Sequence, residues 1–293
     1  MTNPAPEHPP VTRRLKRGSR WVTYCELGDP SGRPVIAAHG SPGSRYQLAL
    51  LADAAARAHV RIICPDRPGF GGSTRERRRG FATGAEDAIA LLDELGIESA
   101  VALGFSGGAG YSLALACEHP ARIERVVLVC GMLPGAPRRT VRARIPIVTV
   151  LYGVARFLPG LAVAMLDGRG PFATTRERNL SAWPSADRGI MADARVQSMM
   201  ARDARAGAQQ GSRAAIDDLR EYSRAFPVER VLQRVDLLHG SADGNVPVEV
   251  ARWGAQQFPD AVLREFDQQG HYFAVTHPDE VVEVLREPLL RVR

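Results

Sequence analysis

The chain has 293 residues, 45% of them hydrophobic and 24% charged, a balance that is ordinary for a globular protein and excludes a disordered or fibrous one. The net charge is +6, but the arginines are scattered and no aromatic residues alternate with their densest runs, so we expect no nucleic-acid partner. Four widely spaced cysteines without a C-x-x-C pair predict neither a disulfide framework nor a zinc site.

The N-terminal region lacks the apolar segment of a secretory signal. We expect residues 1–19, which are rich in proline and polar side chains, to form a flexible tail. The longest apolar stretch, 145–166, is interrupted by Arg156 and by Pro159-Gly160, which argues against a membrane span. These features predict a cytoplasmic protein without a membrane partner.

Apolar runs of strand length and amphipathic helical segments alternate over the first part of the chain. A segment at 20–26, a turn at 28–32 and a run at 34–38 suggest an opening hairpin. Further strands are expected at 60–64, 100–105 and 123–130, and helices at 47–59, 81–95 and 109–118. This alternation indicates βαβ units and a mostly parallel sheet.

The alternation stops after the sixth predicted strand. Residues 132–226 show only helical patterns, at 141–157, 161–167, 188–209 and 214–225. Strands at 235–239 and 261–266 and helices at 247–258 and 277–292 then resume the pattern. We therefore predict an α/β core formed by 20–131 and 227–293, with a helical cap at 132–226.

A G-x-S-x-G sequence, GFSGG at 104–108, lies between a predicted strand and a predicted helix. In this context the serine of such a motif occupies a strained turn and is exposed as a nucleophile. Ser106 is the candidate. The backbone N–H of Gly107, at the start of the helix, is placed to stabilise a developing oxyanion. A glycine-rich turn without chemistry is the simpler alternative.

A serine nucleophile needs a base, and the base needs an acid that orients it. His271 follows the last predicted strand and begins a loop, whereas His119 and His239 fit structural roles and His277 precedes a helix. We therefore assign His271 as the base.

Asp243 follows the strand at 235–239, so its loop and the His271 loop should meet at the carboxyl edge of the sheet. Asp236 would lie at the opposite edge of the sheet, and Asp267 is too close to His271 in the sequence to come from a separate loop. Asp243 could instead serve only as the acceptor of an Asx-turn.

Two glycine-containing loops follow the early strands. HGSPGS at 39–44 occupies the place of the second oxyanion donor, and the N–H of Ser41 is the candidate. The His39 side chain is expected to anchor this loop. DRPGFGGS at 66–73 is expected to form a constrained turn near the site.

With HGSADGNVP at 239–247 and GHYF at 270–273, these five motifs closely resemble the α/β-hydrolase superfamily over residues 20–293. The resemblance implies an eight-stranded, mostly parallel sheet flanked by helices, a helical cap inserted after the sixth strand, and a catalytic triad of Ser106, Asp243 and His271. It also implies that the protein needs no cofactor and no metal. Related epoxide hydrolases and haloalkane dehalogenases carry aspartate in place of Ser106. The turn at 104–108 also differs in sequence from the corresponding turn of proline-specific aminopeptidases.

The resemblance favours hydrolysis of a carboxylic ester of a small, partly apolar molecule through an acyl-enzyme. The cap segment 145–166, with Met132 and four methionines further along the cap, could line an apolar acyl pocket or only dock the cap on the core. Lactone, thioester or amide substrates, a non-hydrolytic enzyme such as a cofactor-free oxygenase, lyase or acyltransferase, a proline-iminopeptidase-like peptidase, and a non-catalytic binding protein remain open.

Overall fold

A computed structural model describes residues 10–76, 80–169, 172, 184–224 and 226–287. Its eight strands form one sheet in the order β1-β2-β4-β3-β5-β6-β7-β8. The strands are β1 (Arg13–Arg17), β2 (Arg20–Gly28), β3 (Arg33–Ala38), β4 (Val60–Pro65), β5 (Ala100–Phe105), β6 (Ile123–Val129), β7 (Arg234–Gly240) and β8 (Ala261–Phe266). Strands β3 to β8 pair in parallel with one another, whereas β2 pairs antiparallel with both β1 and β4. The predicted eight-stranded, mostly parallel sheet is confirmed.

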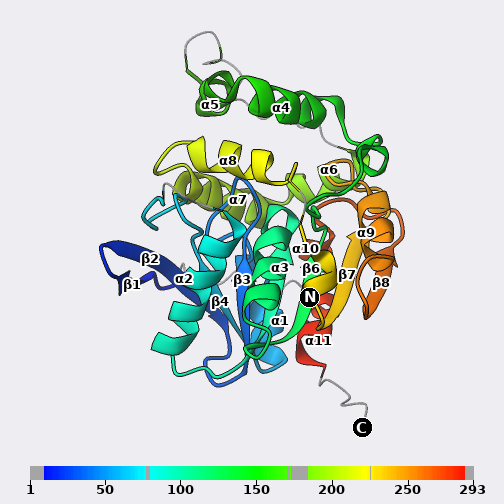
Figure 1. The fold of residues 1–293 in the computed structure, drawn as a ribbon. Helices are drawn as coiled ribbons and strands as arrows, with labels where there is room; N and C mark the ends of the chain where they lie inside the picture. The colour runs from blue at the N-terminus through cyan, green and yellow to red at the C-terminus, as the bar shows by residue number, and fades with distance from the viewer. Residues whose placement is uncertain (1–9, 77–79, 170–171, 173–183, 225, 288–293) are drawn as a thin grey trace.

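Helices cover both faces of this sheet (Figure 1). The core helices are α1 (Ala52–Arg57), α2 (Phe81–Glu94), α3 (Ala109–Glu118), α9 (Val248–Ala255), α10 (Phe273–Thr276) and α11 (Pro278–Arg286). Helices α1 and α11 share one buried apolar cluster with the sheet, and α2, α3 and α9 share a second cluster on the opposite face. The strands between these clusters are almost fully buried, as the continuous apolar runs of the sequence require.

Between β6 and β7, the described residues form five α-helices, which lie over one end of the sheet (Figure 1). They are α4 (Pro146–Phe157), α5 (Pro159–Asp167), α6 (Ser185–Ala192), α7 (Ala194–Gly207) and α8 (Arg213–Glu221). The described residues of this insertion contain no strand, as the helical patterns predict. One helix was expected at 188–209, but Asp193 divides it because its carboxylate caps α7 by accepting the N–H groups of Arg195 and Val196.

The prediction of a flexible tail over residues 1–19 is wrong for its C-terminal part. Residues 13–17 form β1, which pairs with β2 and inserts Leu15 against the core. The charged sequence of β1 hides this strand, although charged side chains are common on the edge strand of a sheet. The opening hairpin therefore joins β1 and β2. The expected pairing across the turn at 28–32 does not form, because β4 lies between β2 and β3.

A buried ion pair ties β6 to β7 at the end of the sheet away from the cap. Arg125 Nε lies 2.5 Å from Asp236 Oδ2, and both side chains are almost fully buried. Replacing Asp236 with alanine would leave the guanidinium buried with only its partly exposed partner Glu287. We expect Asp236→Ala to lower the free energy of unfolding by about 3–5 kcal/mol, measured by urea denaturation.

The matched control is Glu265→Ala, which breaks a half-exposed pair with Arg252. This substitution should cost less than about 1 kcal/mol. Equal losses from the two variants would contradict the importance assigned to the buried pair.

In the described part of the chain, no helix is long and apolar enough to cross a membrane. All four cysteines are buried, and each has a free thiol.

Candidate active site

Ser106 occupies a tight turn between β5 and α3. Its φ of +51° lies in the left-handed region, which is uncommon for a residue other than glycine. The glycines beside it make the turn sterically possible: a Cβ on Gly104 would lie 2.8 Å from the Ala109 Cα, and one on Gly108 would lie 2.0 Å from the Ala38 carbonyl oxygen. The sequence G-F-S-G-G thus folds into the strained strand–turn–helix that the motif predicts.

His271 lies between Ser106 and Asp243. Its Nε2 is 2.9 Å from Ser106 Oγ, and its Nδ1 is 2.7 Å from Asp243 Oδ2. Because a carboxylate only accepts, Nδ1 carries the proton and Nε2 is left to accept the serine hydroxyl proton. The loops after β5, β7 and β8 supply these three residues at the carboxyl edge of the sheet, where the sequence predicts that they meet.

Asp243 also organises its own loop. Its Oδ1 accepts the N–H groups of Asn245 (2.8 Å) and Val246 (2.9 Å), while Oδ2 contacts His271. The Asx-turn that the sequence left open as an alternative is therefore present together with the contact to the histidine. His239, another candidate base, is buried, and its Nε2–H donates to the Val246 carbonyl (2.8 Å).

The remaining alternatives lie elsewhere. Asp236 faces the opposite end of the sheet and pairs with Arg125, as expected from its place at the start of β7. Asp267 accepts a hydrogen bond from the exposed hydroxyl of Ser241. His119 ends α3, where its backbone N–H closes the last turn, and it contacts Glu86.

Electrostatics favour a charged pair at the centre of the site. Burial alone would raise the pKa of Asp243, but the neighbouring His271 and His239 outweigh it, so the pKa of this carboxyl lies well below its usual range. Burial alone would lower the pKa of His271, but Asp243 and, more weakly, Asp187 favour the imidazolium. The pKa of His271 is therefore raised above its ordinary value of 6.5. An imidazole that becomes more basic in this way is suited to accept a proton.

The backbone of the 39–44 loop faces the turn of Ser106. A Cβ built on Gly107 would lie 3.0 Å from the Ser41 nitrogen, and one on Gly40 would lie 3.2 Å from the Ser106 Cβ. The two predicted oxyanion donors, the N–H groups of Ser41 and Gly107, therefore belong to adjacent backbone segments beside the serine. His39 Nδ1–H donates to the Gly40 carbonyl (2.8 Å), and its Nε2 accepts the N–H of Arg67 (3.1 Å), so its side chain anchors the loop.

Three buried cap aspartates, which the sequence reasoning missed, contact the core around this site. Asp187 of α6 accepts the backbone N–H groups of His271 (3.1 Å) and Tyr272 (3.0 Å). Asp203 of α7 accepts from Ser44, and Asp218 of α8 accepts from Tyr111. An aspartate on an amphipathic helix resembles a solvated one in sequence, so no local signal marks these contacts.

The cap segment 145–166 only partly fits the expected apolar pocket. Large apolar side chains on α4 and α5 point outward, with Phe157 74% and Ile147 65% exposed. Ala155 and Ala162 instead pack against α8. Met132 does lie at the site, because its backbone N–H donates to the Ser106 carbonyl (3.0 Å). The docking interpretation therefore accounts for the buried face of these two helices.

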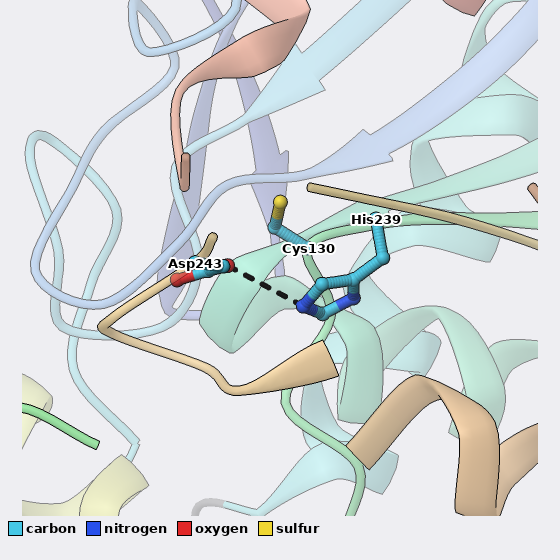
Figure 2. Close-up of side chains that lie close together, drawn as sticks. All are labelled: Cys130, His239 and Asp243. Atoms are coloured by element: carbon cyan, nitrogen blue, oxygen red, sulfur yellow. Dashed lines mark ion pairs between the residues drawn. The ribbon is translucent and has the colours of Figure 1, made fainter. Parts of the chain in front are cut away.

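Among the described residues, one cluster of side chains has the types that can bind a metal ion: Cys130, His239 and Asp243 (Figure 2). His239 Nε2 lies 3.4 Å from Asp243 Oδ2, but the proton on this nitrogen is donated to Val246. Burial, and then the charge of Asp243, raise the pKa of the Cys130 thiol well above its usual range, so it stays protonated. All three donors are thus committed to other bonds or protons, and the set does not fit a metal ion.

Comparison with known proteins agrees with this fold. A family model described as alpha/beta hydrolase fold matches residues 33–161. A pimeloyl-[acyl-carrier protein] methyl ester esterase from Aromatoleum aromaticum is 32% identical over 80% of this chain and 89% of its own length. A 2-hydroxymuconate semialdehyde hydrolase from Pseudomonas putida is 27% identical over 97% of this chain and 95% of its own.

A bromoperoxidase structure from Bacillus anthracis shares the fold, with a TM-score of 0.71 at 21% identity over 94% of this chain and 98% of that one. The chain belongs to the α/β-hydrolase superfamily, and the two curated relatives named above are hydrolases.

Proposed function

We propose that this protein is a serine hydrolase that cleaves a carboxylic ester of a small molecule through an acyl-enzyme. The observation that carries the proposal is the pair of contacts made by one imidazole, 2.9 Å to the Ser106 hydroxyl and 2.7 Å to the Asp243 carboxylate. The methyl ester esterase among its relatives supports an ester in preference to other acyl compounds.

In the proposed reaction, Ser106 Oγ attacks the ester carbonyl while His271 Nε2 takes the hydroxyl proton. Asp243 holds the imidazole in the required tautomer and stabilises its charged form. The N–H groups of Ser41 and Gly107 bind the oxyanion, and His271 then protonates the departing alcohol. A water molecule that gives its proton to His271 hydrolyses the acyl-serine and regenerates the enzyme.

Turnover of 4-nitrophenyl esters from acetate to octanoate tests this proposal. We expect hydrolysis of the esters and much slower cleavage of the matched 4-nitroanilides. Faster cleavage of the anilides would favour the peptidase alternative. A folded protein that turns over none of the esters would contradict the proposal and favour a non-hydrolytic or binding function.

The position of the acid limb in the pH profile tests the role of Asp187. His271 must be neutral to accept the serine proton, so kcat/KM should fall as the pH drops through the raised pKa of His271. Asp187 favours the charged imidazolium. We therefore expect Asp187→Asn to lower the pKa of His271 and to move the acid limb of kcat/KM toward lower pH.

The matched control is Asp203→Asn, which changes a buried cap aspartate bonded to a different core loop. This variant can change the rate, but it should leave the acid limb in place. An unshifted limb in Asp187→Asn, or equal shifts in both variants, would show that Asp187 does not act through His271.

A further inference from the structure

Arg144 is a buried cation at the junction of the cap and the core. It precedes α4 and is only 7% exposed. Its Nε donates to the Asn245 carbonyl (3.0 Å) and its Nη2 to the Met132 sulfur (3.2 Å), while the guanidinium lies 4.2 Å from the centre of the Tyr152 ring. These contacts fix the plane of the guanidinium without neutralising it.

Within the described part of the chain, Arg144 differs from the other buried arginines because it lacks a counter-ion. Arg45, Arg67 and Arg125 each lie within 2.6 Å of a buried aspartate oxygen. No carboxylate of the described residues forms an ion pair with Arg144, and its Nη1 donates to none of them. A buried charge without a partner is costly, so a buried unpaired cation indicates a site for an anion.

The neighbours of Arg144 are also neighbours of the candidate triad. Met132 donates its backbone N–H to the Ser106 carbonyl, and Asn245 donates its backbone N–H to Asp243. The N–H of Ile145 donates to the Gly244 carbonyl (2.8 Å), which fixes the Arg144 segment beside the Asp243 loop. Consistent with this proximity, the positive charge of Arg144 acts to lower the pKa of His271.

We propose that Arg144 binds a carboxylate carried by the substrate, so that the enzyme prefers esters with a second, ionised carboxyl group. The Nη1 group would donate a charge-assisted hydrogen bond to this carboxylate, while the contacts with Asn245, Met132 and Tyr152 hold it in place. This inference rests on the proposed ester hydrolysis and adds the class of substrate. It also adds a charged group to the apolar acyl pocket that the sequence suggested as one alternative.

Two pairs of esters test the proposal, each pair differing in one ionised carboxyl group. On the acyl side, 4-nitrophenyl hydrogen glutarate is compared with its neutral methyl ester. On the alcohol side, 4-acetoxybenzoate is compared with methyl 4-acetoxybenzoate. We expect Arg144→Gln to lower kcat/KM for the anionic member of at least one pair about 10- to 100-fold relative to its neutral partner. The affected pair identifies the side on which the carboxylate lies.

Arg142→Gln is the matched control, because it removes the same charge from an exposed position two residues away. It should leave both anionic-to-neutral ratios unchanged, whereas Arg144→Lys should retain part of the preference. Unchanged ratios in a folded Arg144→Gln, or equal changes in both Gln variants, would overturn the proposal.

If Arg144→Gln does not fold, inhibition of the wild type still decides the question. Glutarate or benzoate should then compete with a neutral ester far better than glutaramide or benzamide, and equal inhibition would overturn the proposal. Turnover of the neutral esters reports on the proposed hydrolase function separately. Its absence would refute that function, whereas normal neutral turnover without any anionic preference would refute only the role of Arg144.

Discussion

Replacing Ser106 with alanine is expected to lower kcat/KM for a 4-nitrophenyl ester by about 10⁴- to 10⁶-fold while leaving the fold intact. The hydroxyl is the only group at the turn that can form the acyl-enzyme of the proposed mechanism. The side chain is not part of the core, so its loss leaves the packing of β5 and α3 unchanged. Steady-state kinetics together with thermal unfolding measure the two effects.

Ser112→Ala provides the control for this experiment. Ser112 lies six residues further along and is buried in α3, whereas the His271 imidazole bonds to Ser106 and Asp243. Its replacement should change kcat/KM far less than that of Ser106. If Ser106→Ala kept more than a few per cent of the wild-type activity, the reaction would not proceed through this serine.

Asp243→Asn is expected to reduce kcat/KM by about 10⁴-fold. Asparagine keeps one oxygen for the N–H groups of Asn245 and Val246, so the loop should hold its shape. The amide nitrogen would then face His271 as a donor. It would favour the tautomer with the proton on Nε2, which cannot accept the serine proton. The loss should appear in kcat with little change in stability.

Asp267→Asn is the matched variant, because Asp267 is the other acidic residue close to His271 in the sequence. Among the described residues its side chain bonds to the exposed Ser241 hydroxyl alone, so its replacement should leave kcat/KM near the wild-type value. Comparable losses in the two variants would contradict the assignment of Asp243 as the residue that orients the base.

The parts of the site that short sequence patterns determine could be predicted. The glycines around Ser106 reveal a turn that larger residues would block. The order of strands and helices places the Asp243 and His271 loops at the same edge of the sheet, because parallel strands end together. These inferences need only local spacing and the handedness of βαβ units.

Features that depend on distant parts of the chain could not be predicted. Strand β1 is mostly charged and is recognisable only through its pairing with β2. The contacts of Arg144 and Asp187 depend on how the cap sits on the core, because their partners Asn245 and His271 lie 101 and 84 residues further along the chain. Residue type alone does not distinguish such contacts from solvated helix positions.

Covalent labelling with a fluorophosphonate, located by mass spectrometry of the digested protein, tests the central proposal most directly. The proposed mechanism predicts one adduct per chain, on the peptide that contains Ser106, and its loss in His271→Ala because the serine would no longer be activated. A folded wild-type protein that stays unlabelled, or that carries its adduct on another residue, would contradict the proposal.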